Sequence, residues 1–489
     1  MKRYLILWII IFYFLPKLQA EDFSSFKVKI EEPHEIVLLN HGLSSLEERL
    51  EMIENAQTSI DVEYFIFNLD QSGRMFTQAL VEKAKQGVKV RMLLDYYMVK
   101  NKFTPFFAHE MAKYGIEVKY YNVTSLLNIF KGQYRNHRKL LVVDGKEAIT
   151  GGRNIGDEYF DLSDKFNFLD RDIKISGSIV THIQDTFNKV WESKQTSILK
   201  RQKEPSRNDP AYTNSNKGGM GYDQDKFRQD LSNWKRKVLD AIDFLSKKNN
   251  QLFDDELRSK AKSILAREYH GTCNKMTFNS EYPLVGKASR KDRVIKHDIS
   301  DRIRNAKEKI LFDSPYFIVD DESQSALKEA LDNKTQVVLL TNSLHSTDAV
   351  YVYAAFDSLI KDWISAGLQA YVYKGSSLSV YDYASDSIAK SRFGVHAKSF
   401  VFDNKDVIIG TFNFDPRSAN YNTELTVGCE DNPELAHEIT TDIENRIQNS
   451  FYLDSSKTVD DVEYYKVGFF KRLEYLFIKI PANFLEYLL

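Results

Sequence analysis

The chain has 489 residues, which is enough for two to four domains, and its hydrophobic content of 43% allows a sizeable buried core. Its formal net charge is −2 at pH 7, so it lacks the basic excess that general nucleic-acid binders show. The composition therefore favours a multi-domain globular protein and argues against a nucleic-acid partner.

The first twenty residues, MKRYLILWIIIFYFLPKLQA, have the pattern of a secretory signal peptide. Lys2 and Arg3 give a basic start, an apolar run follows until Pro16, and a small-residue cleavage site ends at Ala20. The apolar run is short for a membrane-spanning helix, but an uncleaved anchor stays open. We expect an exported protein.

Residues 35–195 alternate between strand and helix patterns and are predicted to form the first domain. Helices are predicted at 43–56 and 71–86, and strands within 56–68 and at 87–95 and 114–122. Strands that alternate with helices indicate an α/β domain with a largely parallel sheet.

A polar triplet opens the next apolar strand, at 140–143. His137 and Lys139 share one strand face, because successive side chains on a strand point to opposite sides, and Asp144 follows at the turn. For a single copy, a solvated strand end would explain this pattern.

Residues 200–270 form a predicted insertion. The part from 200 to 225 is rich in Pro, Gly, Asn and Ser, which predicts a flexible loop. The part from 226 to 269 is predicted to be helical, because apolar residues recur at intervals of three and four: Phe227, Leu231, Trp234, Val238, Ile242 and Leu245. A structural linker is favoured over a lid, since lids are the minority role among long connections.

Residues 275–450 repeat the first domain, with helices predicted at 322–332 and 350–366 and strands within 306–320 and at 335–343 and 366–374. Each member of a second motif lies 259 residues after its counterpart: His396 after His137, Lys398 after Lys139, Asp403 after Asp144, Gly410 after Gly151 and Asn413 after Asn154. A solvated strand end has no reason to recur in this way. We therefore expect two tandem α/β sandwich domains that form a pseudo-twofold dimer within one chain, each delivering a His–Lys pair to a shared interface.

The tail from 460 to 489 has an amphipathic helical pattern. One helical face is apolar, Lys471, Arg472 and Lys479 lie off it, and Pro481 is predicted to break the helix before a second apolar stretch; the apolar face comprises Phe469, Phe470, Leu473, Leu476, Phe477 and Ile480. Such a helix suits a membrane surface or the protein's own core, and the pattern does not separate the two. Cys273 and Cys429 either pair or stay as free thiols, and no Cys/His cluster has zinc-ligand spacing.

Two imidazoles and two ammonium groups that converge suit phosphoryl transfer without a metal. A neutral His can attack phosphorus and form a covalent phosphohistidine, and a protonated second His can donate to the departing oxygen. The two Lys can neutralise the phosphoryl oxygens in place of a divalent cation. Asn154 and Asn413 can add neutral donors to the same oxygens.

The two copies of H-x-K-x4-D followed by G-x-x-N resemble the phospholipase D superfamily, and the stretches GGRNIGDEYF and FDPRS look most like bacterial cardiolipin synthases. The resemblance implies one shared active site without a cofactor, with His137 as nucleophile and His396 as acid and base. It implies that Asp144 and Asp403 are structural supports. It also implies a downstream acid that orients the His of its own half, which maps to Asp172 for His137 and to Glu424 for His396.

The expected function is phosphatidyl transfer between phospholipids such as phosphatidylglycerol at a membrane surface. Hydrolysis to phosphatidic acid is the close alternative, an exported metal-independent nuclease is a weaker one, and a scaffold with a dead site is weaker still. We expect the protein in the periplasm or outside the cell, peripherally associated with a membrane. The internal pseudo-dimer removes any need for a second chain to complete the site.

Overall fold

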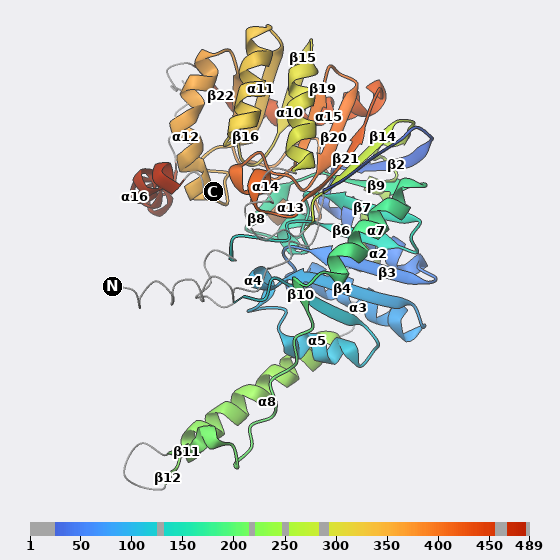
Figure 1. The fold of residues 1–489 in the computed structure, drawn as a ribbon, viewed down its shortest axis with the longest axis vertical. Helices are drawn as coiled ribbons and strands as arrows, with labels where there is room; N and C mark the ends of the chain where they lie inside the picture. Colours follow the sequence, from blue (N-terminus) through green and yellow to red (C-terminus); the bar gives the residue numbers. More distant parts are fainter. Residues whose placement is uncertain are drawn as a thin grey trace, which may run out of the picture.

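Two nine-stranded sheets form the centre of the molecule in the computed structural model (Figure 1). The structure describes residues 25–124, 132–214, 221–246, 254–282, 293–454 and 467–485, so the predicted signal peptide lies outside the described residues. Within those ranges, no helix is long and apolar enough to cross a membrane.

The first sheet has the strand order β10–β5–β4–β3–β6–β7–β9–β2–β13. Its strands, in that order, are Thr196–Ser197, Glu117–Tyr121, Lys89–Asp95, Ser59–Tyr64, Leu140–Val143, Glu147–Gly151, Asp172–Ser176, His34–Leu39 and His270–Cys273.

The second sheet has the order β1–β14–β21–β20–β19–β15–β16–β17–β22. Its strands, in that order, are Phe26–Ile30, Met276–Ser280, Leu425–Cys429, Asp406–Gly410, Ser399–Phe402, Lys309–Asp313, Gln336–Asn342, Gln369–Tyr373 and Ser450–Leu453. The two sheets match strand for strand around their centres, which is the predicted α/β pseudo-dimer.

The sheets are mixed, so the prediction of largely parallel sheets is wrong. The parallel pairs are β3–β4 and β4–β5 in the first sheet and β15–β16 and β16–β17 in the second, whereas the other pairings of both sheets are antiparallel. A parallel pair needs a crossover connection, and helices supply one only between these central strands. The turn at Asp144 and Gly145 instead joins β6 to β7 as a hairpin.

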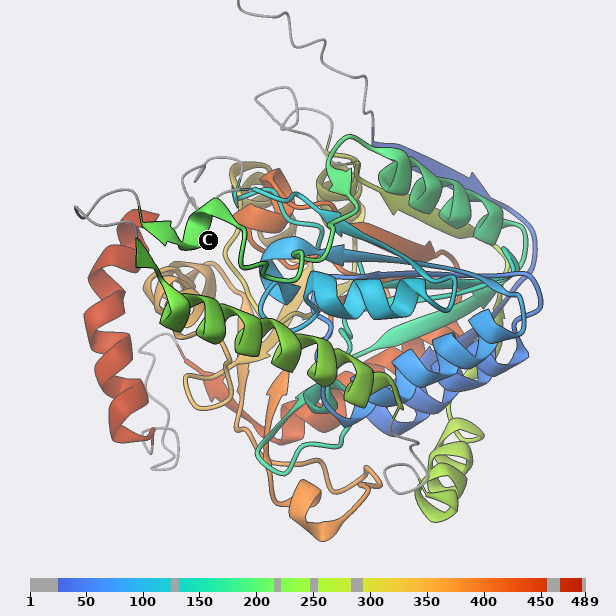
Figure 2. The same ribbon diagram turned by 90° about the horizontal axis from the view of Figure 1, so that it is seen from below.

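Helices cover the outer face of each sheet, and two further helices lie in the core that the sheets share (Figures 1 and 2). The outer helices are α2 (Gly42–Asn55), α3 (Gln71–Lys85) and α5 (Pro105–Ala112) on the first sheet, and α10 (Val294–Asn305), α11 (Asp321–Asp332) and α12 (Val350–Ser365) on the second. The shared core contains α7 (Ile179–Glu192) and α15 (Pro433–Gln448). This core joins the two halves into one body.

Strand β6 shows how one short apolar run serves both layers. Leu140 and Val142 pack in the shared core, and Leu141 and Val143 pack under the outer helices of the first half. Alternating side chains on a strand buried on both faces require this continuous apolar run. The motif that precedes the run is thereby held at the seam between the halves.

The chain exchanges strands between its two sheets. β1 pairs with β14 of the second sheet, and β13 pairs with β2 of the first, so the chain crosses from the second sheet to the first between β1 and β2 and returns to the second between β13 and β14. A disulfide joins Cys273, at the end of β13, to Cys429, at the end of β21. The sequence left this pairing open, and the structure shows that the disulfide links the two sheets.

The described part of the insertion contains the helices α8 (Gln224–Ser246) and α9 (Asp255–Leu265), and α8 extends away from the body (Figure 1). The inner end of α8 packs on the first half through Phe244 and Leu245, and Trp234 contacts Phe106 of α5. The predicted loop at 200–225 contains the short hairpin of β11 (Thr213–Asn214) and β12 (Gly221–Tyr222). The linker role of the insertion stays a prediction.

The disulfide should contribute measurably to stability. Because Cys273 and Cys429 lie 156 residues apart, the cross-link restricts a large loop of the unfolded chain, and its removal should lower the free energy of unfolding by about 2–5 kcal/mol. The measurement is thermal unfolding of the wild type and of a Cys273→Ser/Cys429→Ser variant, each with and without reductant. Reductant should lower the Tm of the wild type alone. Two free thiols titrated in the unreduced, denatured wild type would contradict the pairing.

Candidate active site

The two motifs meet at the seam between the halves through a symmetric pair of backbone hydrogen bonds. The N–H of His137 donates to the carbonyl of Thr423 at 3.0 Å, and the N–H of His396 donates to the carbonyl of Leu169 at 2.8 Å. Thr423 and Leu169 precede β21 and β9 of the opposite halves. Each His is therefore attached to the half that did not supply it, and the structure brings the two motifs together as the sequence predicted.

Each imidazole contacts a carboxylate from the opposite half. Nδ1 of His137 lies 3.0 Å from Oε2 of Glu424, and Nδ1 of His396 lies 2.6 Å from Oδ2 of Asp170. With Nδ1–H donated to a carboxylate, Nε2 of each ring is left for chemistry. The prediction that Glu424 orients the His of its own half is therefore wrong, because Glu424 orients His137.

Asp172 does not contact either catalytic imidazole, so its predicted role is also wrong. Its carboxylate accepts hydrogen bonds from Arg49 at 2.9 Å, from Arg153 at 3.2 Å and from Ser45 at 2.7 Å. Asp172 is the first residue of β9 and lies opposite Gly151 inside the first sheet, whereas Asp170 lies in the turn that reaches the seam. A sequence signal exists, since Asp170 and Glu424 occupy matching places just before β9 and β21.

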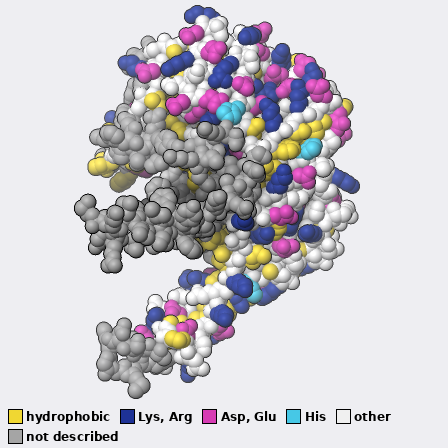
Figure 3. Space-filling view, in the orientation of Figure 1, with side chains coloured by type: hydrophobic (Ala, Val, Ile, Leu, Met, Phe, Trp, Pro, Cys, Tyr) yellow, Lys and Arg dark blue, Asp and Glu magenta, His cyan; other side chains and the backbone are white. Residues whose placement is uncertain are grey.

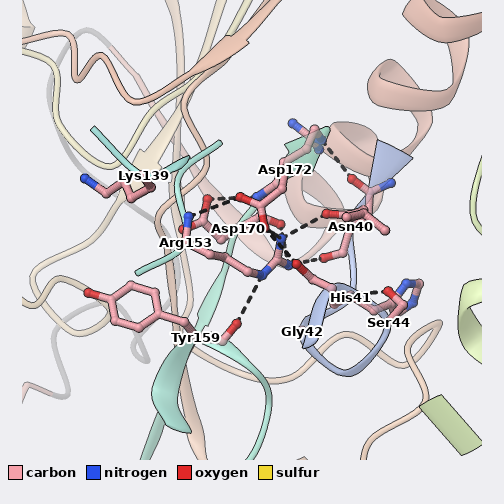
Figure 4. A network of polar contacts seen from close by, with 12 residues as sticks. Asn40, His41, Gly42, Ser44, Lys139, Arg153, Tyr159, Asp170 and Asp172 are labelled. Atoms are coloured by element: carbon pink, nitrogen blue, oxygen red, sulfur yellow. Dashed lines mark hydrogen bonds and ion pairs between the residues drawn. The ribbon is translucent and has the colours of Figure 1, made fainter. Parts of the chain in front are cut away.

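Arg153 holds this turn in place (Figure 4). Its guanidinium donates to the carbonyl of Asp170 at 2.9 Å, to the carboxylate of Asp172, and to the carbonyls of Leu39 and Asn40 at 2.9 and 2.6 Å. The side chain is completely buried. Five geometrically fixed donors suit Arg to such a junction, which positions the carboxylate of Asp170 without touching the imidazole.

The two carboxylates are supported differently at equivalent places. A Cβ on Gly152 would lie 2.0 Å from Oδ1 of Asp170, so only Gly leaves room for that side chain. Thr411 occupies the equivalent position in the second half and donates its hydroxyl to Oε2 of Glu424 at 2.6 Å. The hydroxyl of Ser418 donates to the other oxygen of Glu424 at 2.7 Å.

The two lysines place buried positive charge beside the imidazoles. Nζ of Lys139 donates to the carbonyl of His137 at 2.7 Å, and Nζ of Lys398 lies 2.9 Å from Nδ1 of His396. Burial lowers the pKa of Lys139 well below its usual range, and the nearby Lys398 lowers it further. Burial likewise lowers the pKa of Lys398, against the opposing effect of Asp170. A bound anion would relieve this cost, so the site is prepared for a phosphoryl group.

Both imidazoles favour the neutral form. Burial lowers the pKa of His137 to about 4; the carboxylate of Glu424 opposes this shift, and Lys139 reinforces it. Burial also lowers the pKa of His396, together with Lys398 and against Asp170. Burial would raise the pKa of Glu424, but His137 and Lys139 outweigh burial and lower it. Neutral imidazoles beside ionised carboxylates are what nucleophilic attack requires.

Asp144 and Asp403 act as structural supports away from the imidazoles, as the resemblance implied. Asp144 accepts the backbone N–H groups of Gln57, Thr58 and Ser59 at 2.7–2.9 Å. Asp403 accepts those of Lys307, Glu308 and Lys309 at 2.8–3.2 Å. Each Asp thereby ties the hairpin behind its motif to the start of the neighbouring strand.

The amide oxygens of the two motif asparagines, Asn154 and Asn413, differ in their hydrogen bonding. Oδ1 of Asn154 accepts the N–H of Ile66 at 3.1 Å, which fixes the orientation of its amide. Oδ1 of Asn413 is buried and has no hydrogen-bond partner among the described residues. Their predicted donation to phosphoryl oxygens stays a prediction.

Aromatic rings enclose the imidazoles, a role that no motif in the sequence indicates. The ring of Phe65 lies 4.8 Å from that of His137, and the rings of Phe168 and Tyr159 lie 4.7 and 5.4 Å from that of His396, measured between centroids. These walls exclude water and strengthen the electrostatic interactions within the site. The described residues contain no group of three or more His, Cys, Asp or Glu arranged to hold a metal ion.

Comparison with known proteins identifies the family. The family model described as "Cardiolipin synthase, PLD-like domain" matches residues 50–191 and 299–447, which is more than half of the chain, so the protein belongs to this family of the phospholipase D superfamily. A Helicobacter pylori protein described as uncharacterized is 29% identical over 440 residues, covering 85% of this chain and 80% of its own.

Two further relatives extend the comparison. "Cardiolipin synthase C" of Escherichia coli is 27% identical over 404 residues and covers 79% of each chain. The crystal structure of phosphatidylserine synthase from Haemophilus influenzae is 13% identical, with a TM-score of 0.63, and covers 96% of this chain and 98% of its own. At that identity the structural likeness shows a shared fold.

Changing each carboxylate to an amide should separate the two acids, because the change at Asp170 should lower turnover and the change at Asp172 should lower stability. Asp170→Asn replaces the charged acceptor of His396 Nδ1–H by a neutral amide, whose NH2 group favours the wrong imidazole tautomer, so turnover should fall by about 10²–10⁴-fold with little change in Tm. Asp172→Asn leaves two buried guanidinium groups underpaired, so the free energy of unfolding should fall by about 3–5 kcal/mol. Turnover and thermal unfolding of both variants provide the measurement. A large turnover defect in a fully stable Asp172→Asn protein would instead indicate that Asp172 orients His137.

Burial of His137 should also make stability depend on pH. The pKa of the folded group, about 4, lies below the ordinary value of 6.5, so between these values the unfolded chain binds a proton that the folded chain does not. The folded state should therefore lose stability as the pH falls from about 6.5 to about 4, by up to about 3 kcal/mol from this group.

The measurement is denaturant unfolding across that pH range in a buffer without phosphate. His137→Asn keeps an amide donor for Glu424 but cannot be protonated, so its stability should depend less steeply on pH. Identical slopes for the two proteins would contradict a neutral His137 in the folded state.

Proposed function

We propose that the protein is a phosphatidyltransferase that moves a phosphatidyl group from one phospholipid to the hydroxyl of another, in the manner of a cardiolipin synthase. The observation that carries the proposal is the pair of enclosed imidazoles, each bound to a carboxylate of the opposite half and accompanied by a buried lysine. This arrangement suits a two-step displacement at phosphorus.

In the first step, Nε2 of His137 attacks the phosphorus of the donor lipid. A nitrogen–phosphorus bond forms, and the bond from phosphorus to the head-group oxygen breaks. His396, protonated at Nε2 once the phosphoryl group is bound, gives its proton to the departing oxygen. The covalent phosphohistidine divides one difficult displacement into two easier ones.

In the second step, the hydroxyl of the acceptor attacks the same phosphorus. His396 takes the proton of that hydroxyl, a new oxygen–phosphorus bond forms, and the bond to His137 breaks. With phosphatidylglycerol as both donor and acceptor, the products are cardiolipin and glycerol. With water as acceptor, the same steps give phosphatidic acid.

The two lysines stabilise the charge that gathers on the phosphoryl oxygens in both steps. They stand where many phosphoryl-transfer enzymes use a divalent cation. Buried ammonium groups next to a developing charge are far more effective than solvated ones, because no water competes for the charge. We therefore expect activity without an added metal or cofactor.

Support for a lipid substrate comes from the family and from a relative. The Escherichia coli relative is named a cardiolipin synthase, and the family model carries the same description. We accordingly expect phospholipid donors and acceptors such as phosphatidylglycerol, presented at a membrane surface.

We also propose that the protein is exported, to the periplasm or beyond. The disulfide between Cys273 and Cys429 supports this location, because such bonds persist in oxidising compartments. The signal-like pattern of residues 1–20 points the same way.

The experiment supplies radiolabelled phosphatidylglycerol in mixed micelles with EDTA and compares the wild type with His137→Ala and His396→Ala. The wild type should form cardiolipin, and each variant should lose about 10³-fold or more of that activity. The denatured wild-type protein, quenched during turnover, should retain acid-labile label on His137.

Two controls separate the alternatives. Thermal unfolding shows whether the His variants remain folded, and Asp144→Asn, which alters a support remote from the imidazoles, reports on losses due to folding alone. Phosphatidic acid as the sole product would replace transfer by hydrolysis. No lipid product, together with DNA cleavage in EDTA, would move the assignment to a nuclease.

A further inference from the structure

The C-terminal helix α16 (Phe469–Leu485) lies along α12 at the outer edge of the second half (Figures 1 and 2). Two of its described polar side chains, Lys471 and Tyr475, attach it to the body. Nζ of Lys471 donates to the carbonyls of His345 and Thr347 at 3.1 and 2.6 Å, and the hydroxyl of Tyr475 donates to Asp357 of α12 at 2.7 Å. The ring of Tyr475 also packs on that of Tyr353. The helix therefore has one fixed face.

The opposite face of the helix is apolar and open to solvent. Phe470, Leu473, Leu476 and Phe477 are 84%, 39%, 58% and 74% exposed. Hydrophobic side chains project at the left edge of Figure 3, where α16 lies in the same orientation. These four members of the predicted apolar stripe thus face away from the protein core, and Lys471 and Tyr475, which lie between them in the sequence, dock on the body; the side chains of Phe469 and Ile480 lie outside the described ones. The docked-helix interpretation describes the face that carries Lys471 and Tyr475, and the surface interpretation describes the opposite face.

The attachment of α16 reaches the border of the active site. Lys471 donates hydrogen bonds to the loop of 345–347. The next residue, Asp348, is close enough to His396 and Lys398 that its negative charge opposes the lowering of their pKa values. Asp348 acts on the pKa of Lys471 as well, which burial lowers to about 8. The loop that borders the catalytic groups therefore also fixes the orientation of the apolar stripe.

We propose that the exposed face of α16 inserts into the surface of an anionic phospholipid bilayer and holds the active site against it. Apolar side chains on a fixed helix match the acyl boundary of such a surface, and the exposed Arg472 at one edge of the stripe can meet its anionic head groups, while the exposed Glu474 lies at the other edge. The lipid occupant rests partly on the proposed function, since a lipid enzyme must meet its substrate in a membrane.

A second copy of the chain fits this face less well. A stable dimer buries about 800 Å² on each partner, with a broad apolar centre and a polar rim. Four side chains on a single helix offer a narrow stripe well short of that area. A bilayer needs no complementary shape, so a narrow stripe is sufficient for it.

The test compares the wild type with Phe470→Ser/Phe477→Ser in flotation with vesicles of equal parts phosphatidylglycerol and phosphatidylcholine. Both residues are mostly exposed and neither touches the catalytic groups, so the variant should fold normally. We expect its partition onto vesicles to fall at least about tenfold, because two buried aromatic side chains are lost from the lipid. Turnover of a short-chain phosphatidylglycerol below its critical micelle concentration should be unchanged.

The matched control is Leu239→Ser/Val380→Ser, which removes two other exposed apolar side chains, 63% and 60% exposed, from α8 and from the loop after β17. Its partition should equal that of the wild type. Arg472→Glu should weaken binding to these vesicles at low salt and leave binding to pure phosphatidylcholine unchanged.

Every outcome decides the proposal independently of turnover, because partition can be measured with inactive His137→Ala protein. Unchanged partition of the Phe470→Ser/Phe477→Ser variant overturns the proposal. A change of mass in light scattering without a change in partition also overturns it and makes the face a self-association surface. If the Phe470→Ser/Phe477→Ser variant loses partition onto vesicles while the wild type shows no lipid activity, the docking surface is supported and the proposed function is contradicted.

Discussion

The crosswise contact between each imidazole and a carboxylate of the opposite half is the constraint on which the rest of the structure depends. His137 takes its acid from the second half and His396 takes its acid from the first, so neither half contains a working imidazole–carboxylate pair of its own. Hydrogen bonds of 3.0 and 2.6 Å weaken steeply with small changes in distance and angle. A shift of one half by about an ångström would therefore disable both imidazoles together.

Several interactions fix the two halves against each other, and the turn that contains Asp170 and Arg171 takes part in them. Arg171 directly follows Asp170, and its guanidinium is buried among Asp313, Asp442 and Ser399 of the second half. The same turn thus supplies a catalytic carboxylate and anchors itself across the seam. A buried ion-pair cluster is weak evidence for stability, since desolvation offsets its attraction, but it tolerates only one arrangement of its members. The exchanged strands and the disulfide limit the larger motions that such a cluster alone would not resist.

The repeat made much of this architecture predictable from the sequence. A constant offset of 259 residues locates His137, Lys139, His396 and Lys398, and alternating strand and helix patterns give the two α/β halves. Asp170 was missed because the offset changes to 254 residues by the time the chain reaches the two acids, and because pairing was assumed to stay within one half. The sequence does not distinguish Asp170 from Asp172, because both are buried acids only two residues apart. Only the geometry of the turn before β9 shows which of the two carboxylates reaches an imidazole.

Other features depend on contacts that no local pattern contains. The mixed sheets arise from the hairpin at Asp144, which reverses the chain where a continued βαβ pattern would have kept it parallel. The pairing of Cys273 with Cys429 follows from the strand exchange, which places an end of β13 beside an end of β21. The amphipathic pattern of α16 correctly gave a helix with an apolar stripe, but the prediction that Pro481 breaks this helix is wrong, because α16 runs through Pro481 to Leu485. The polar ends of Lys471 and Tyr475 determine which face of α16 docks on the body, and a hydrophobic pattern contains no information about them.

The pseudo-symmetry breaks at the carboxylates, and this difference supports distinct roles for the two imidazoles. Glu424 shares its charge among the donors Thr411, Ser418 and Asn422, at 2.6, 2.7 and 3.2 Å. Asp170 receives the backbone N–H of Arg171 on one oxygen and holds the imidazole of His396 closely with the other. A carboxylate whose charge is already shared stabilises an imidazolium less, which leaves His137 the better nucleophile. The less committed carboxylate of Asp170 stabilises a protonated His396, the form that a leaving oxygen requires. In the proposed mechanism, the residues that back the two carboxylates, Gly152 behind Asp170 and Thr411 behind Glu424, would therefore give the two similar halves different roles.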